Sequence, residues 1–216
     1  MTTRNRAFTL VELIVVLGVV LVLAALLMPV ARSVMDRSQI ARCSSRIRNL
    51  NGALLLWVQD NNQVFPSLAV PKYGDVGTGI WFGYAKLVLP YLGMGLEEAE
   101  RRPEVFSCPL QHNSVDGPGY LFNGGNQFDP SFPGIAGASM MSINHPARTI
   151  TLYEVSGVFP TSWHGDPGGT NSYDKAPSVA AFVDGHAEYT PFYWSGSTWS
   201  VSADPPKEYT YQWSGE

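Results

Sequence analysis

One uncharged apolar run near the N-terminus constrains the fold of this chain most. It extends from Leu13 to Ala31, 19 residues without a charged side chain. A helix needs about 20 apolar residues to cross the hydrocarbon core of a bilayer. A cleaved signal peptide is the alternative, but its apolar region has about 7–15 residues and ends at a small-residue cleavage site. Met28-Pro29-Val30-Ala31 is a poor site of that kind, so the run predicts a retained transmembrane helix.

The composition excludes several classes of protein for the whole chain. Its 216 residues include 14 Lys and Arg against 18 Asp and Glu, and a net charge of −4 argues against a basic nucleic-acid binder. Charged residues make up 15%, too few for a disordered polyelectrolyte. The 21 Gly and 16 Pro favour a loop-rich β domain over a helical bundle. Two cysteines exclude a four-thiolate zinc site and allow one disulfide or two free thiols.

A short motif overlaps the start of the apolar run. It reads Ala7-Phe8-Thr9-Leu10-Val11-Glu12-Leu13, and Pro29 follows 21 residues after Phe8. A carboxylate at the membrane edge is costly in hydrocarbon, which marks Glu12 as a candidate functional residue. Together these residues resemble the N-terminus of type IV prepilins and of type II secretion pseudopilins.

The resemblance implies a role for each residue of the motif. A prepilin peptidase would cut between Ala7 and Phe8 and methylate the new amino group of Phe8. Glu12 would pair with the amino terminus of a neighbouring subunit during assembly, and Pro29 would kink the helix, since proline removes a backbone donor. Ala7 departs from the family, which usually has Gly before the cut.

The resemblance also implies a topology: a single pass through the inner membrane with the C-terminal domain in the periplasm. The distribution of charges indicates the opposite, because cytoplasmic flanks are usually enriched in Lys and Arg. Arg4 and Arg6 precede the run, whereas Arg32, Arg37 and Arg42 follow it. We give more weight to the motif, since the peptidase acts from the cytoplasmic face.

The helix is expected to continue beyond the membrane, from Phe8 to about Asn61. Its second half has apolar residues at spacings of three and four, on one stripe. These residues are Ile40, Cys43, Ile47, Leu50, Leu54 and Trp57. The stripe predicts packing against the globular domain of the same chain; a seam with a partner helix is the alternative.

The rest of the chain is expected to form a small antiparallel sheet. Strands are predicted at 148–155, 178–183, 186–192, 194–201 and 209–213, with Asp184-Gly185 as a two-residue hairpin turn. Before them, 67–85 is predicted as loop, 86–93 as a short helix and 97–102 as a charged turn. The predicted class is therefore α+β and pilin-like, with a long N-terminal helix packed on the sheet. The expected segments are a leader at 1–7, a transmembrane and assembly helix at 8–31, its amphipathic continuation at 32–62 and a β domain at 63–216.

Later residues resemble a pilin-like subgroup abundant in Planctomycetes and Verrucomicrobia. The resemblance rests on residues 41–66 and on Phe106-Ser107-Cys108-Pro109. The subgroup also has a C-terminal His, nine residues and Asp-Gly, but here Asp174 stands at the position of that His. The nearest upstream histidine, His164, lies twenty residues before Asp184, so no role is assigned to it.

The two cysteines leave two interpretations open. Cys43 and Cys108 can pair if the domain is exported, because disulfides persist in oxidising compartments. Cys43 also lies on the apolar stripe, where a buried free thiol is common.

Two metal sites can be written from the sequence. Asp166, Asp174 and Asp184 lie in or near Gly-rich loops and offer the oxygen ligands that calcium prefers, although their spacing fits no EF-hand. A zinc site from His112, His164 and His186 would require a clustering that spacing does not show. Otherwise no cofactor is expected. The chain is not expected to be an enzyme, because it has no Gly-x-Ser-x-Gly, His-Glu-x-x-His or phosphate-binding Gly-rich motif.

The sequence thus favours a structural subunit, pseudopilin-like or minor pilin-like, of a type II secretion or type IV pilus-type filament. Its expected partners are a prepilin peptidase, other pilin-like subunits, the assembly platform and ATPase, and the inner membrane; no nucleic acid is expected. The alternative is a membrane-anchored extracytoplasmic module that binds glycan or calcium and does not polymerise.

Overall fold

The computed structural model describes most of the chain, and its contacts divide the chain into two units. The described residues are 10–67, 79–111, 119–124, 133–158, 161–164, 173–196 and 203–216, without the side chains of 29–32, 79–82, 100 and 103. The first unit is Met1–Ser38 and the second is Gln39–Glu216.

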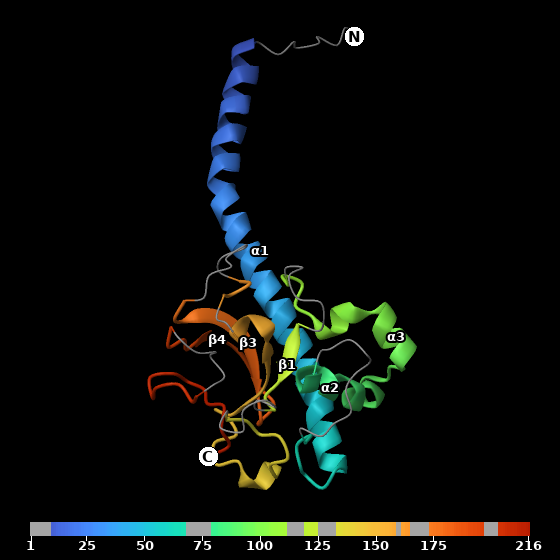
Figure 1. Cartoon of the computed structure of the whole chain (residues 1–216). Coiled ribbons are helices and arrows are strands. Elements are labelled where there is room, and N and C mark those ends of the chain that lie inside the picture. Colours follow the sequence, from blue (N-terminus) through green and yellow to red (C-terminus); the bar gives the residue numbers. More distant parts are fainter. Residues whose placement is uncertain are drawn as a thin grey trace. The chain divides into compact units, whose positions relative to one another are not determined.

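One long helix, α1, extends from Leu10 to Asp60 and contributes residues to both units (Figure 1). It continues through Pro29 without interruption, so proline has not ended the helix there. The kink predicted at Pro29 stays a prediction.

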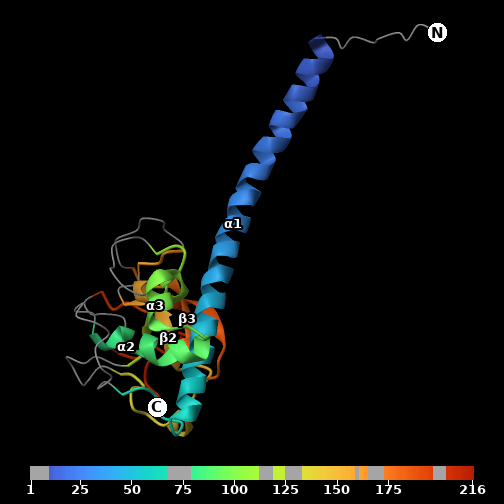
Figure 2. The ribbon, with the colours of Figure 1, turned by 90° about the vertical axis from the view of Figure 1, so that its right-hand side faces the viewer.

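The second half of α1 packs on the domain of its own chain. The stripe residues Cys43, Ile47 and Leu54 have no exposed surface, and they form one core with Leu152, Val179 and Ala181 of the sheet. The predicted intramolecular packing is confirmed, and the stripe is not left open for a partner helix. In Figure 2, the helices α2 (Gly79–Val88) and α3 (Leu96–Arg101) lie on the same side of α1 as the sheet.

A four-stranded antiparallel sheet forms the centre of the second unit. Its order is β1 (Tyr120–Phe122), β2 (Ile150–Glu154), β3 (Ala176–Phe182), β4 (Ala187–Phe192). The predicted α+β class, with a long helix on a small antiparallel sheet, is confirmed. Both faces of the sheet are covered, because Val179 packs in the core with α1 while Ala180 packs among C-terminal aromatic rings.

The C-terminal aromatic residues close the second face. Trp213 is fully buried, and its ring centroid lies 4.9 Å from that of Tyr153 on β2. Residues 209–213 were predicted as a strand, but they form only an isolated bridge between Thr149 and Gln212. Side-chain packing by Trp213, in place of the expected strand pairing, therefore attaches this segment to the sheet.

Several other local predictions differ from the structure. Residues 79–85, predicted as loop, belong to α2; 86–88 complete it, and a 3-10 helix follows at Leu89–Leu92. Residues 97–102, predicted as a turn, lie almost wholly within α3. Residues 194–196 form no strand, and 197–202 lie outside the described part of the chain.

The turn between β3 and β4 is confirmed with a different length. Phe182 N–H donates to the His186 carbonyl, so three residues form the loop where two were predicted. Gly185 has φ +95°, which explains the glycine at the last loop position.

Candidate functional site

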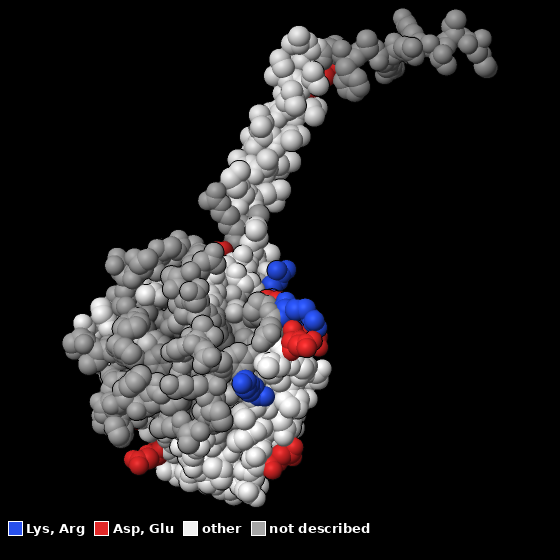
Figure 3. All heavy atoms as spheres, turned by 45° about the vertical axis from the view of Figure 1, so that its right-hand side comes forward, with Lys and Arg blue, Asp and Glu red and all other residues white. Residues whose placement is uncertain are grey.

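The first candidate site is the apolar part of α1. The large apolar side chains between Leu10 and Met28 are all 53–72% exposed, and this helix is long and apolar enough to cross a membrane. Figure 3 shows this stretch as almost free of charged side chains, in contrast to the arginines and acidic residues that follow. Glu12 lies in the first turn of α1. Ala7 and Phe8, the predicted cleavage and methylation residues, lie outside the described residues.

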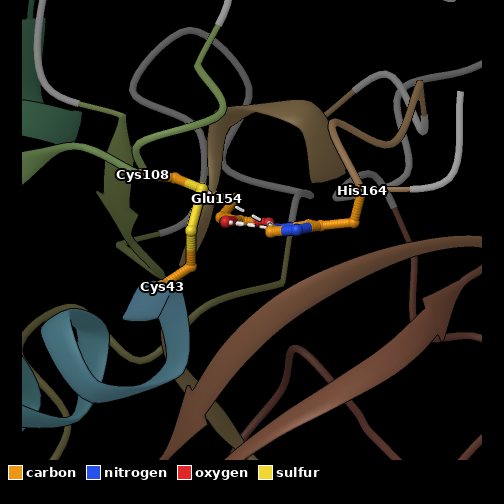
Figure 4. Close-up of side chains that lie close together, drawn as sticks. All are labelled: Cys43, Cys108, Glu154 and His164. Atoms are coloured by element: carbon orange, nitrogen blue, oxygen red, sulfur yellow. Dashed lines mark hydrogen bonds and ion pairs between the residues drawn. A yellow bond between two sulfur atoms is a disulfide. The ribbon is translucent and has the colours of Figure 1, made fainter. Parts of the chain in front are cut away.

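The second candidate site is buried in the β domain and contains both cysteines. Cys43 of α1 and Cys108 form a disulfide with an S–S distance of 2.06 Å, across 65 residues (Figure 4). Arg46, one turn after Cys43, donates from Nη1 to the carbonyls of Glu104 and Ser107 at 2.8 Å each. The segment that carries Cys108 is thus held against α1 by a covalent bond and by two charged hydrogen bonds.

A buried carboxylate and imidazole lie beside this disulfide. Glu154, the last residue of β2, and His164 have no exposed side-chain surface, and Nε2 of His164 lies 3.0 and 3.1 Å from the two carboxylate oxygens. Nε2 donates to this carboxylate in the tautomer that carries its hydrogen on Nε2. Ser178 Oγ and Val179 N–H of β3 also donate to Oε2 of Glu154, at 2.8 and 2.9 Å.

Two further contacts complete the surroundings of His164. Its Nε2 lies 3.8 Å from Sγ of Cys108, and its ring meets that of Tyr189 edge-on at 5.4 Å. Nδ1 has no hydrogen-bond partner among the described residues. Nδ1 is therefore the one buried polar atom of His164 and Glu154 that the described residues leave unsatisfied.

The pKa of Tyr120 on β1 depends on the charge of this cluster. Burial raises the pKa of its hydroxyl well above the usual range, and the negative charge of Glu154 raises that pKa further. The hydroxyl stays protonated and donates to the Cys43 carbonyl at 3.2 Å.

Two of the three aspartates of the predicted calcium site, Asp174 and Asp184, lie far apart in the structure. Asp174 and Asp184 lie beyond opposite ends of β3, which alone spans about 20 Å at 3.3 Å per residue, so the two cannot ligate one ion. Asp166 lies outside the described residues. Asp174 instead accepts from the Tyr209 hydroxyl at 2.6 Å. Burial raises the pKa of Asp174, but hydrogen bonds from Tyr209 and from backbone N–H groups outweigh it, and the pKa lies below its usual value.

Of the predicted zinc histidines, the structure describes His164 and His186, and these two lie in different surroundings. His186 is on the exposed β3–β4 turn, stacked on Phe182 and with Nδ1 2.5 Å from Oδ1 of Asp184. His164 is buried beside Glu154, and His112 lies outside the described residues.

Sequence reasoning missed Glu154 entirely and gave His164 no role. One signal was present, since Glu154 ends the β-branched and apolar run Ile150–Tyr153 with a carboxylate. A charged residue directly after a buried strand is often held by a partner, because an unpaired buried charge is strongly disfavoured.

Comparison with known proteins supports the first site. Residues 2–28 match the family model of the prokaryotic N-terminal methylation motif, which supports a type IV pilin-like prepilin leader. No curated protein and no solved structure matches the chain. The match includes Ala7, Phe8 and Glu12. It does not reach residues 41–66 or 106–109, so the resemblance to the subgroup stays a prediction. The motif and the apolar helix together indicate a membrane-anchored, single-pass protein.

Proposed function

We propose that this chain is a pseudopilin-like or minor pilin-like structural subunit of a type II secretion or type IV pilus-type filament. The proposal rests on one observation: the methylation motif at 2–28 overlaps the exposed apolar part of α1. Such a motif indicates a structural protein that a prepilin peptidase processes and that assembles with other pilin-like subunits.

The exposed helix needs an apolar environment. Burying one Leu or Val side chain stabilises by about 1.5–3 kcal/mol, and fifteen large apolar side chains between Leu10 and Met28 are exposed. A bilayer provides that environment before assembly. In a filament the same side chains would pack against the helices of neighbouring subunits.

In the proposed filament, Glu12 sets the register in which the helices of neighbouring subunits pack. A carboxylate that is transferred into an apolar helix bundle without a cation is strongly disfavoured. In the proposed filament the methylated amino group of Phe8 from a neighbouring subunit supplies that cation. The platform protein and ATPase would drive assembly from the inner membrane, and the β domain would be periplasmic.

The test compares Glu12→Ala and Glu12→Gln with the control Glu97→Gln, which changes an exposed carboxylate on α3. Each full-length variant is expressed in native cells, and membrane insertion, N-terminal processing and recovery in sheared filaments are measured. We expect all variants to insert, while only the Glu12 variants fail to enter filaments.

Filaments at wild-type levels from Glu12→Ala would contradict the proposal. A wild-type chain that stays a monomer beside its intact assembly machinery would favour the non-polymerising binding module.

A further inference from the structure

Four side chains of metal-binding types converge in the core of the β domain. They are Cys43, Cys108, Glu154 and His164, and one donor atom of each lies within 4.8 Å of every other (Figure 4). They come from α1, from the segment after the 3-10 helix Pro103–Phe106, from β2 and from the segment that follows β2. Because α1, the Cys108 segment and β2 are far apart in sequence, the fold itself creates the cluster.

The donor atoms suit zinc. Thiolate, imidazole and carboxylate are its usual ligands, and bonds of about 2.0–2.3 Å in a tetrahedron place neighbouring ligand atoms roughly 3.3–3.8 Å apart. Nε2 of His164 lies 3.8 Å from Sγ of Cys108 and 3.0 Å from Oε1 of Glu154. These two edges of a tetrahedron already have about the required length.

Only the disulfide prevents coordination by the sulfurs. They are bonded at 2.06 Å and would have to move to about 3.7 Å apart, the spacing of two zinc-bound thiolates. A bonded sulfur has no thiolate charge to donate. The oxidised chain therefore has the ligands in place but no zinc site.

The carboxylate is already oriented by its surroundings. Ser178 Oγ and Val179 N–H both donate to Oε2 of Glu154. Hydrogen-bond partners of this kind fix the orientation of metal ligands and raise metal affinity. Oε1 contacts His164 and would turn to the metal with little rearrangement.

We propose that the reduced chain binds one Zn²⁺ through Cys43, Cys108, Glu154 and Nε2 of His164, and that disulfide formation abolishes this site. A dithiol reductant delivers two electrons and two protons to the disulfide and becomes a cyclic disulfide itself. Zinc then displaces one proton from each thiol. The imidazole gives up its Nε2 proton to solvent and takes one on Nδ1, so that a neutral ring binds the metal through Nε2.

With this site, an exported chain can join α1 to the β domain in two ways: through zinc while it is reduced and through the disulfide once it is oxidised. Chains made in a reducing compartment arrive with free thiols, and disulfides form only in an oxidising one. Zinc would join the same four segments before oxidation. It would also keep both thiolates from forming disulfides with other chains. This role lies within the second unit and does not depend on filament assembly.

The experiment uses the full-length chain in detergent, without a histidine tag, in oxidised and reduced form. Both are incubated with zinc chloride and desalted, and the zinc content per chain is measured by elemental mass spectrometry. We expect one zinc per reduced chain and none per oxidised chain. With Co²⁺ as the probe, the reduced chain should show the thiolate-to-cobalt absorption of a tetrahedral site.

Variants separate this site from adventitious binding. We expect Cys108→Ser to abolish zinc binding, and Glu154→Gln and His164→Ala each to weaken it at least 10-fold. His186→Ala, which removes an exposed histidine, should leave it unchanged. Far-UV circular dichroism monitors the fold of every sample with and without zinc.

Three results would overturn the proposal. The first is a reduced wild-type chain that takes up no stoichiometric zinc, whether it stays folded or unfolds without recovery on adding the metal. The second is zinc binding that survives in Cys108→Ser. The third is a folded His164→Ala chain with wild-type zinc affinity.

Discussion

The side-chain amide of Asn51 on α1 donates a 2.8 Å hydrogen bond to the carbonyl of Phe182 at the end of β3, 131 residues later. Its carbonyl oxygen accepts from the Thr151 hydroxyl of β2 at 2.5 Å. Asn51 is fully buried beside the apolar stripe. One polar residue thus joins the helix to two strands and fixes how α1 sits on the sheet.

Asn51→Ala should destabilise the β domain. It removes the hydrogen bonds of Asn51 to the Phe182 carbonyl and from the Thr151 hydroxyl, and two such bonds together contribute about 1–3 kcal/mol. We expect the free energy of unfolding to fall by about that amount, measured by urea unfolding of the full chain in detergent with tryptophan fluorescence. Asn49→Ala, at an exposed position of α1, is the control. Equal stability of the two variants would refute this role of Asn51.

Loss of the disulfide should weaken the same attachment. Cys43 and Cys108 close a loop with a sequence separation of 65, and such bonds contribute about 2–4 kcal/mol. In buffer with a zinc chelator, Cys43→Ala/Cys108→Ala should lower the free energy of unfolding by this amount. Chemical reduction of the wild-type chain should cause a similar loss. A double variant as stable as the oxidised wild type would show that the bond contributes no stability.

The buried tyrosines should make the β domain sensitive to alkali. Burial raises the pKa of Tyr84, Tyr120, Tyr153 and Tyr211. In the unfolded chain they ionise near pH 10, so above that pH the unfolded state binds fewer protons than the folded state. The stability from these groups is complete below about pH 10 and falls as the pH rises further.

Spectrophotometric titration tests this pH dependence. The buried tyrosines should ionise together with the loss of near-ultraviolet circular dichroism. Ionisation of all ten tyrosines near pH 10 with an intact folded signal would contradict it.

The sequence predicted those parts of the fold that depend on local periodicity. The stripe through Cys43, Ile47 and Leu54 located the packed face of α1. A β-branched run located β2, and the Asp184-Gly185 turn signal located β3 and β4. β1 was missed because three residues are too short for a pattern to stand out. The first part of α2, residues 79–85, was missed because its Gly- and aromatic-rich sequence does not suggest a helix, and packing of Tyr84 and Val88 in the core stabilises it.

The two candidate sites also differ in how far local sequence could predict them. The N-terminal motif is contiguous, so Glu12 could be identified from neighbouring letters. The pair of Glu154 and His164 depends on donors from β3 and on the position of Cys108, which only the folded chain brings together. The role of Asn51 likewise depends on Phe182, 131 residues later, so no local pattern indicates it.

The most direct test of the account is the N-terminal sequence and intact mass of the protein from its native membranes. We predict a chain that begins at N-methylated Phe8, which would show cleavage after Ala7 by a prepilin peptidase. A chain that still begins at residue 1 or 2, or one that begins beyond residue 31, would contradict the central claim that this is a processed, pilin-like subunit.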